Sequence, residues 1–184
     1  MLFYFTTGAH FNPVVSLVDY LHGDMSLRDL FSYTICQISG GILGTIVSNI
    51  QFNVKIEISE KDRNQGHLWF GEIISTVTLL MLIHGCIRTG QKSTVPFAVG
   101  AWVCSGHFFT SSTIFGNPAV TIARMFSNTF TGIEPGSVGQ FIAFQYIGAV
   151  VAFGMIRFFY PRNISMRRED NLYMRVCIKG AQNC

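Results

Sequence analysis

Four long apolar segments constrain the fold of this chain more than any other feature of its sequence. They are Leu30–Phe52, Leu68–Ile87, Val95–Ile114 and Val138–Phe159. Each is long enough to cross a membrane, because a helix needs about 20 residues to span roughly 30 Å of hydrocarbon. Only 12% of the residues are charged and 49% are hydrophobic, whereas a soluble domain carries about 25% charged residues. The sequence therefore predicts an all-α membrane protein.

Charge and cysteine usage exclude several classes of protein. The formal net charge is +3, and the basic residues are scattered between apolar segments, which disfavours a nucleic-acid partner. The five cysteines include no Cys-x-x-Cys pair, so the sequence indicates neither a zinc site nor a disulfide framework. The sequence also shows no nucleophile–base spacing and no cofactor motif. We therefore expect no metal, no cofactor and no enzymatic activity.

Basic residues near the ends of the apolar segments predict the orientation of the chain. Arg162, Arg167 and Arg168 follow the last segment, and Arg88 and Lys92 lie between the second and third segments. The connection between the first two segments carries bases and acids in equal number and shows no bias. Because basic loops stay inside, the C-terminal tail is expected in the cytoplasm and the mixed connection outside.

A short motif occurs twice in the chain. NPVVSL starts at Asn12, and its near copy NPAVTI starts at Asn117. Each copy is followed by a segment that contains Gln-x-x-Gly, at Gln37–Gly40 and at Gln145–Gly148. Two motifs in the same order are typical of an internal repeat. One span separates the first copy from the outer connection, and the second copy follows the third span. The two copies are therefore predicted in opposite orientations, as in inverted-topology repeats.

Asparagine followed by proline is typical of the first turn of a helix, since asparagine is a favoured N-cap and proline is favoured at the first helical position. The stretches that begin at Pro13 and Pro118 are about ten residues long, which is too short to span a membrane and suits re-entrant half-helices. Helix N-termini carry partial positive charge, so two of them facing a lumen repel cations. The side-chain amides of Asn12 and Asn117 are then placed to donate hydrogen bonds to a neutral solute.

These motifs resemble the aquaporin (major intrinsic protein) family. The matching stretches are TTGAHFNPVV, GEIISTVTLLMLI, AVGAWVCSGHF and GNPAV, together with the Gln-x-x-Gly segments, and they extend from Thr6 to Phe159. The resemblance implies a right-handed helix bundle of six spans and two half-helices, and a homotetramer with a pore in each protomer. It also implies passive flow of small neutral solutes across the plasma membrane. It places the pore at Asn12, Pro13, Val14, Asn117, Pro118 and Ala119.

The chain departs from the family pattern at its start. The family has two spans before the first Asn-Pro motif, and here Asn12 lies close to Met1. We therefore expect an N-terminally truncated member with four full spans plus two re-entrant half-helices, the first two spans being largely missing. The expected organisation is a partial channel domain at residues 1–160 and a cytoplasmic tail at residues 161–184. In the first motif, Val14 also replaces the usual alanine.

The third departure concerns solute selection. The family usually has arginine directly after the second Asn-Pro-Ala, and here that position is Val120, with Arg124 about one turn further on. With an apolar residue at this position, the chain resembles the solute-passing branch of the family. That branch includes bacterial members linked to arsenic resistance. The resemblance therefore implies a selectivity filter that contains His107, Ile114 and Val120. Such a filter favours glycerol or a neutral metalloid hydroxide such as arsenous acid (arsenite).

Four further polar residues match family positions with a structural role. The resemblance implies that Glu72 accepts hydrogen bonds from the loop that carries the second motif, although a carboxylate inside a membrane is also a functional candidate in its own right. Gln37 and Gln145 are expected to brace loops or helices, and His10 to pack the first loop. Two histidines without an expected role in the pore are His22 and His84.

Three functions stay open on the sequence alone. The first is a passive channel for small neutral solutes such as water, glycerol or metalloid hydroxides. The second is a non-conducting truncated fragment, because without the first two spans one wall of the pore faces lipid. The third and least favoured is a membrane enzyme that uses Glu72, His84 and His107.

Overall fold

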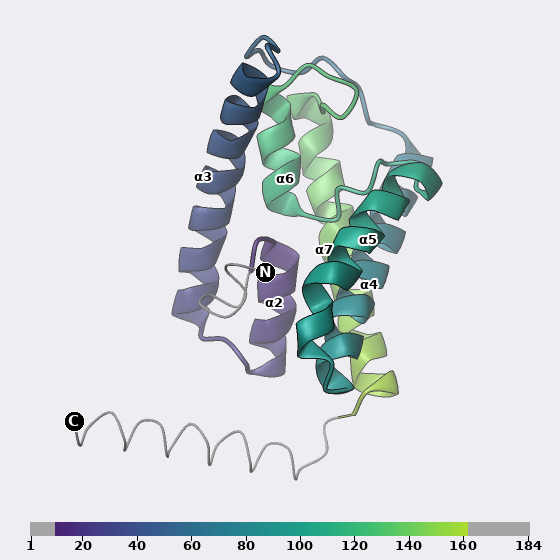
Figure 1. Cartoon of the computed structure of the whole chain (residues 1–184). Coiled ribbons are helices and arrows are strands. Elements are labelled where there is room, and N and C mark those ends of the chain that lie inside the picture. Colours follow the sequence, from purple (N-terminus) through teal and green to yellow (C-terminus); the bar gives the residue numbers. More distant parts are fainter. Residues whose placement is uncertain (1–9, 162–184) are drawn as a thin grey trace, which may run out of the picture.

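The computed structural model describes residues 10–161, and no strand occurs in that range. Figure 1 shows the helices packed together as one bundle. In chain order the elements are α2 (Pro13–His22), α3 (Leu27–Gln51), α4 (Gly66–Arg88), η1 (Lys92–Thr94), α5 (Val95–Phe109), α6 (Pro118–Ala123), η2 (Arg124–Phe126) and α7 (Pro135–Phe159). The expected cytoplasmic tail lies outside the described residues, apart from its first residue.

In the described part of the chain, three helices are long and apolar enough to cross a membrane, and they are α3, α4 and α7. All three were expected as spans, and small differences at their ends have local causes. α7 starts at Pro135 rather than Val138, because proline is pre-organised for the first helical turn. α3 starts at Leu27 because the hydroxyl of Ser26 caps it by accepting a hydrogen bond from the amide of Asp29.

The third expected span is shorter in the structure than in the sequence-based prediction. A helix over Val95–Ile114 is expected, but α5 ends at Phe109, where the Thr-Ser-Ser-Thr stretch begins. Thr110 has extended backbone, and hydroxyl side chains compete for the backbone hydrogen bonds that a helix needs. The 15 residues of α5 extend for about 22 Å, which is less than the roughly 30 Å of hydrocarbon. The helical turn η1 leads directly into α5 and lengthens it at its other end.

The two expected half-helices are α2 and α6, and their N-terminal ends meet near the middle of the bundle (Figure 1). α2 ends at His22 because Gly23 adopts the left-handed conformation with φ of 79°. α6 ends at Ala123 and continues as the single turn η2. α2 packs against α3 and α7, and α6 packs mainly against α3 with further contacts to α7. Each half-helix therefore touches the long helices of both repeats.

Glycine permits the close contact between α4 and α7. A Cβ atom at Gly148 would lie 2.9 Å from Cβ of Thr76 and 3.0 Å from the carbonyl oxygen of Ile73. Small residues at such positions let membrane helices approach closely. In the first repeat the corresponding Gly40 has no described atom within 4 Å of its Cβ position, so the two repeats differ in what they pack against.

Apolar side chains lie both inside the bundle and on its outer surface. The core beside the first half-helix is formed by Val14, Val18, Leu80, Ala149, Ala152 and Ile156. A second core beside the second half-helix is formed by Leu68, Phe115, Ile133 and Phe141. The exposed apolar residues of α3 are Leu27, Phe31, Ile35, Leu43, Val47 and Ile50. An outer face of this kind suits contact with lipid.

Candidate functional site

The two asparagines of the repeated motif cap their own half-helices and bond each other's loops. The side-chain oxygens of Asn12 and Asn117 accept hydrogen bonds from the amides two residues further on, at 3.1 and 2.9 Å. The side-chain nitrogen of Asn12 donates to the carbonyl of Gly116 at 2.8 Å. In return, the side-chain nitrogen of Asn117 donates to the carbonyl of Phe11 at 2.9 Å. Each asparagine thus bonds the residue that directly precedes the other.

This reciprocal pair, called here the asparagine junction (Asn12, Asn117, Phe11 and Gly116), orients two amide groups. Each oxygen is used by a helix cap, so each nitrogen points to the junction. A side-chain NH2 group carries two hydrogens, and the opposite carbonyl uses one of them. The second hydrogen of each group can bond an acceptor such as a hydroxyl or water oxygen. The residues that follow the two asparagines are buried in the bundle, and they are Pro13, Val14, Pro118 and Ala119.

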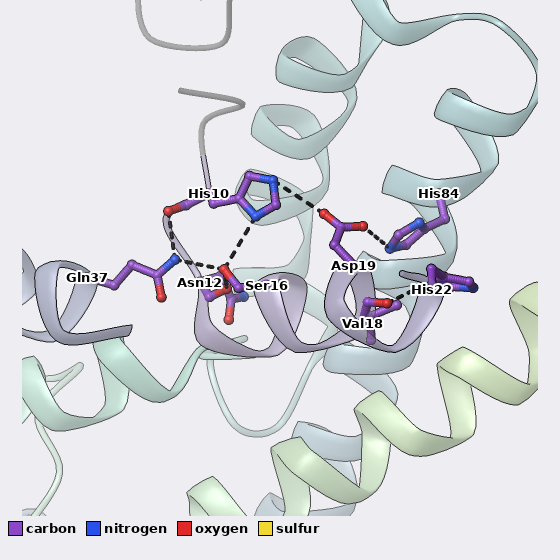
Figure 2. Close-up of polar contacts among 8 residues, drawn as sticks. All are labelled: His10, Asn12, Ser16, Val18, Asp19, His22, Gln37 and His84. Carbon is purple, nitrogen blue, oxygen red and sulfur yellow. Dashed lines mark hydrogen bonds and ion pairs between the residues drawn. The ribbon is translucent and has the colours of Figure 1, made fainter. Parts of the chain in front are cut away.

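A hydroxyl and a glutamine support each half-helix in the same way. The hydroxyls of Ser16 and Thr121 donate to the carbonyl of their capping asparagine, at 3.3 and 2.9 Å. The side-chain nitrogen of Gln37 donates to the hydroxyl of Ser16 at 3.0 Å and to the carbonyl of His10 at 2.7 Å (Figure 2). Gln145 donates to the hydroxyl of Thr121 at 2.8 Å. The sequence repeat is therefore also a repeat of contacts.

Glu72 of α4 joins the second half-helix to the long helices. Its side chain is fully buried, and it accepts hydrogen bonds from the amides of Phe115 and Gly116 at 3.1 and 2.8 Å. The side-chain nitrogen of Gln145 on α7 donates to it at 2.6 Å. Gly116 also belongs to the asparagine junction, so Glu72 holds one residue of that junction by its amide. The contacts join the loop before α6 to α4 and α7, and the bracing role of Glu72 and Gln145 stays a prediction.

A group of ionisable side chains surrounds the C-terminal half of α2 (Figure 2). Nε2 of His10 lies 3.3 Å from one carboxylate oxygen of Asp19, and Nε2 of His84 on α4 lies 3.6 Å from the other. The ring of His22 lies 5.2 Å from that of His84, between centroids. Asp19 therefore connects the loop before α2 with α4. Within residues 10–161, no group of three or more His, Cys, Asp or Glu side chains is placed to hold a metal ion.

The pair Asp19–His84 is expected to couple α2 to α4 energetically. In a double-mutant cycle of Asp19→Ala and His84→Ala, followed by chemical unfolding in detergent micelles, we expect a coupling energy of about 0.5–1.5 kcal/mol, because the two groups are in contact and largely buried. The matched control is Lys55 with Glu57, a pair that is 3.0 Å apart but exposed. That pair should show no measurable coupling. Equal results for the two cycles would contradict the prediction.

The three residues expected in a selectivity filter lie in different surroundings. His107 is exposed on α5, and its Nδ1 lies 2.7 Å from the carbonyl of Val103 one turn earlier. Ile114 is 7% exposed and fills the space beside Gly106 of α5. Val120 is half-buried in the first turn of α6. The role of these three residues in a filter stays a prediction.

A buried arginine lies beside the loop before α6. Arg63, in the connection between α3 and α4, is 2% exposed, and its guanidinium donates to the carbonyls of Gly132, Ser112 and Phe130 at 2.7, 3.0 and 3.1 Å. Burial is the largest cause that lowers the pKa of Arg63, and the charge of Glu72 acts in the opposite direction. Arginine keeps its proton in folded proteins, so the guanidinium acts here as a charged donor.

Sequence reasoning missed Asp19 and Arg63. A signal for Asp19 was available, since it is the acid in the otherwise mostly apolar stretch PVVSLVDYLH. Arg63 had no such signal: it stands in a connection with three bases and three acids, and its partners are backbone carbonyls. No pattern of side chains in a sequence shows which carbonyls a folded loop will present.

Two short helices that meet at their capped N-termini, beside helices long enough to cross a membrane, define a membrane protein with paired re-entrant half-helices. The chain belongs to the major intrinsic protein family, whose sequence pattern (MIP: Major intrinsic protein) matches residues 2–116. Members of this family are channels and not enzymes, so the hypothesis of a membrane enzyme is set aside.

Two curated proteins resemble the chain over most of its length. Aquaglyceroporin AqpS of Rhizobium meliloti (strain 1021) is 40% identical over 152 residues, which are 82% of this chain and 65% of that protein. An aquaglyceroporin of Toxoplasma gondii (strain ATCC 50611 / Me49) is 32% identical over 162 residues, which are 83% of this chain and 60% of that protein. The chain thus spans less than two thirds of the length of these relatives.

Proposed function

We propose that the chain forms a passive transmembrane channel for small neutral solutes, with glycerol, water and metalloid hydroxides such as arsenous acid as candidates. The observation that carries the proposal is the asparagine junction. Two amide groups donate from opposite half-helices at one place in the bundle, at 2.8 and 2.9 Å from their backbone acceptors. The names of the two relatives, both aquaglyceroporins, support glycerol as a solute.

The junction favours neutral solutes that carry an acceptor oxygen. A hydroxyl oxygen that passes Asn12 and Asn117 replaces its bond to water with bonds to their remaining amide hydrogens. The N-terminal end of α2 adds partial positive charge, which raises the energy of a cation at the same point. In this mechanism the side chains do not react, and the solute moves down its own gradient.

Solute choice is assigned to the residues beside the second half-helix. We place His107, Ile114 and Val120 in the selectivity filter, where Val120 gives an apolar edge in place of the cation that the family usually has there. Pro13, Val14, Pro118 and Ala119 set the direction of the two half-helices from within the bundle. A filter without that cation offers more room to glycerol than a strictly water-selective arrangement does.

The assembly and orientation of the channel are also proposed. We infer a homotetramer in the plasma membrane, with residues 161–184 in the cytoplasm. The exposed apolar side chains of α3 support an integral membrane position. The basic residues Arg88 and Lys92 between α4 and α5 support a cytoplasmic location for that connection under the positive-inside rule.

The test is solute flux in liposomes that contain the full chain. Stopped-flow light scattering under a glycerol gradient should show faster entry than in empty vesicles. Val120→Arg should slow glycerol entry about tenfold, which corresponds to an added barrier of about 1.4 kcal/mol. The reason is that an arginine in the first turn of α6 narrows the filter and adds a charge that must stay solvated.

The control for this substitution is Val150→Arg on the exposed face of α7, which should insert less well but leave flux per inserted protein unchanged. Equal glycerol entry for Val120→Arg and the parent chain would remove Val120 from the filter. No entry above empty vesicles, with the protein shown to be folded and inserted, would contradict the channel and favour a non-conducting fragment.

A further inference from the structure

We propose that Arg63 is a positioning residue for the second half-helix: it holds the segment from Thr110 to Asn117 in a strained conformation, and so sets the asparagine junction. The effect on solute passage rests on the channel function proposed above, whereas the effect on the segment does not. Arg63 lies in a different connection of the chain and touches neither asparagine.

Arg63 binds two loops together, unlike a solvent-exposed charge in a connection; its contacts are called here the clamp. All three guanidinium nitrogens donate to backbone carbonyls. One carbonyl, that of Ser112, lies before α6, and the other two, those of Phe130 and Gly132, lie after it. Hydrogen bonds from a charged donor are stronger than those between neutral groups. The planar fork of arginine presents its donors in a fixed and widely spaced geometry, whereas the donors of lysine are gathered on one compact ammonium. Arg63 therefore fastens both loops that flank α6.

An aromatic surface completes this buried site. The central carbon of the guanidinium lies 4.8 Å from the ring centre of Phe115 and 6.0 Å from that of Phe141. A cation over an aromatic face is attracted to the ring. Phe115 precedes the glycine of the asparagine junction, so Arg63 contacts the segment both at a carbonyl and at a side chain.

The segment between these contacts carries backbone strain. Thr113 has φ of 63° and Ile114 has φ of 49°, which is the left-handed region, and both side chains are β-branched. This conformation is unfavourable for such residues and persists only where the surrounding structure imposes it. Gly116 follows with φ of 48°, which glycine tolerates.

Two buried side chains impose the strain from the two ends of this segment. Arg63 holds the carbonyl of Ser112, directly before the strained residues. Glu72 holds the amides of Phe115 and Gly116, directly after them. The carbonyl of Gly116 then accepts the bond from Asn12. Loss of the clamp at Ser112 lets the strained residues relax, and the relaxation reaches the junction along the backbone from Thr113 to Gly116.

The first test is hydrogen exchange on the full chain in nanodiscs, read by mass spectrometry. Arg63→Gln and Arg63→Lys should speed exchange in peptides from residues 110–117 about tenfold, with α4 and α7 unchanged. The control Lys55→Gln removes a charge from the same connection without touching the clamp, and should leave exchange unchanged. Parent-like exchange of residues 110–117 in both Arg63 variants would overturn the proposal.

The second test is the ratio of glycerol permeability to water permeability in liposomes that contain the full chain. This ratio does not depend on how many channels fold, so a purely structural loss leaves it constant. We expect it to change about threefold in Arg63→Lys and to stay constant in Lys55→Gln. A lower flux at constant ratio would overturn the positioning role. A parent chain that passes no solute would contradict the proposed function, and exchange alone would then decide the role of Arg63.

Discussion

Replacing Glu72 by alanine is expected to be the most damaging single change in the described part of the chain. The substitution removes the acceptor of three buried N–H groups: the amides of Phe115 and Gly116, and the one of the two side-chain N–H groups of Gln145 that does not bond Thr121. Each buried donor that loses its partner costs about 1–3 kcal/mol. We therefore expect the free energy of unfolding, measured by chemical denaturation in detergent micelles, to fall by at least about 3 kcal/mol.

A matched control lies further along the same helix. The hydroxyl of Thr78 bonds carbonyls of α4 itself, at Ile74 and Ser75, so Thr78→Val should change the free energy of unfolding by less than about 0.5 kcal/mol. Glu72→Gln should fall between the two, since its amide oxygen still accepts while its nitrogen faces donors. Parent-like stability of Glu72→Ala would show that water or another group satisfies these donors.

Replacing Gly148 by valine is expected to have the second largest effect. Its Cβ would lie within 3.0 Å of Thr76 and of the backbone at Ile73, so α4 and α7 must move apart. Overpacking of this kind costs about 1–3 kcal/mol, and here a backbone atom rather than a flexible side chain is in the way. We expect a loss near the upper end of that range in detergent unfolding, together with a lower yield of folded protein.

The control for Gly148 lies on the same helix. Gly154 of α7 has no described atom within 4 Å of its Cβ position, so Gly154→Val should be close to neutral. Because valine replaces glycine within one helix in both variants, the difference between them isolates the contact with α4. Equal stability of the two variants would mean that α4 and α7 pack less closely than in this structure.

The half-helices and their caps were predictable because they depend on neighbouring residues. Asparagine before proline starts a helix through a side-chain bond to an amide two residues away, and this local chemistry is the same at Asn12 and Asn117. The spans α3, α4 and α7 were predictable for a similar reason, since length and hydropathy along the chain decide them.

The end of α5 and the role of Arg63 were not predictable in this way. The predicted span continued past Phe109 to Ile114, but the backbone leaves the helix at Thr110 and turns left-handed at Thr113 and Ile114. That turn is held by Arg63 and Glu72, which lie 49 and 44 residues away along the chain from Ser112 and Gly116, the residues that they hold. Hydropathy carries no signal for bonds between a side chain and a distant carbonyl or amide.

The order of residues along the chain was enough to predict a helical membrane protein with two half-helices, and the repeated Asn-Pro motif was enough to indicate the family. The reason is that helix capping depends on residues within one turn, and membrane spanning on the length and hydropathy of one continuous segment. Two features became visible only in the folded chain: each asparagine bonds the residue before the other, and Asp19 lies between two histidines. These contacts join segments far apart in the chain, so they exist only after the helices have packed.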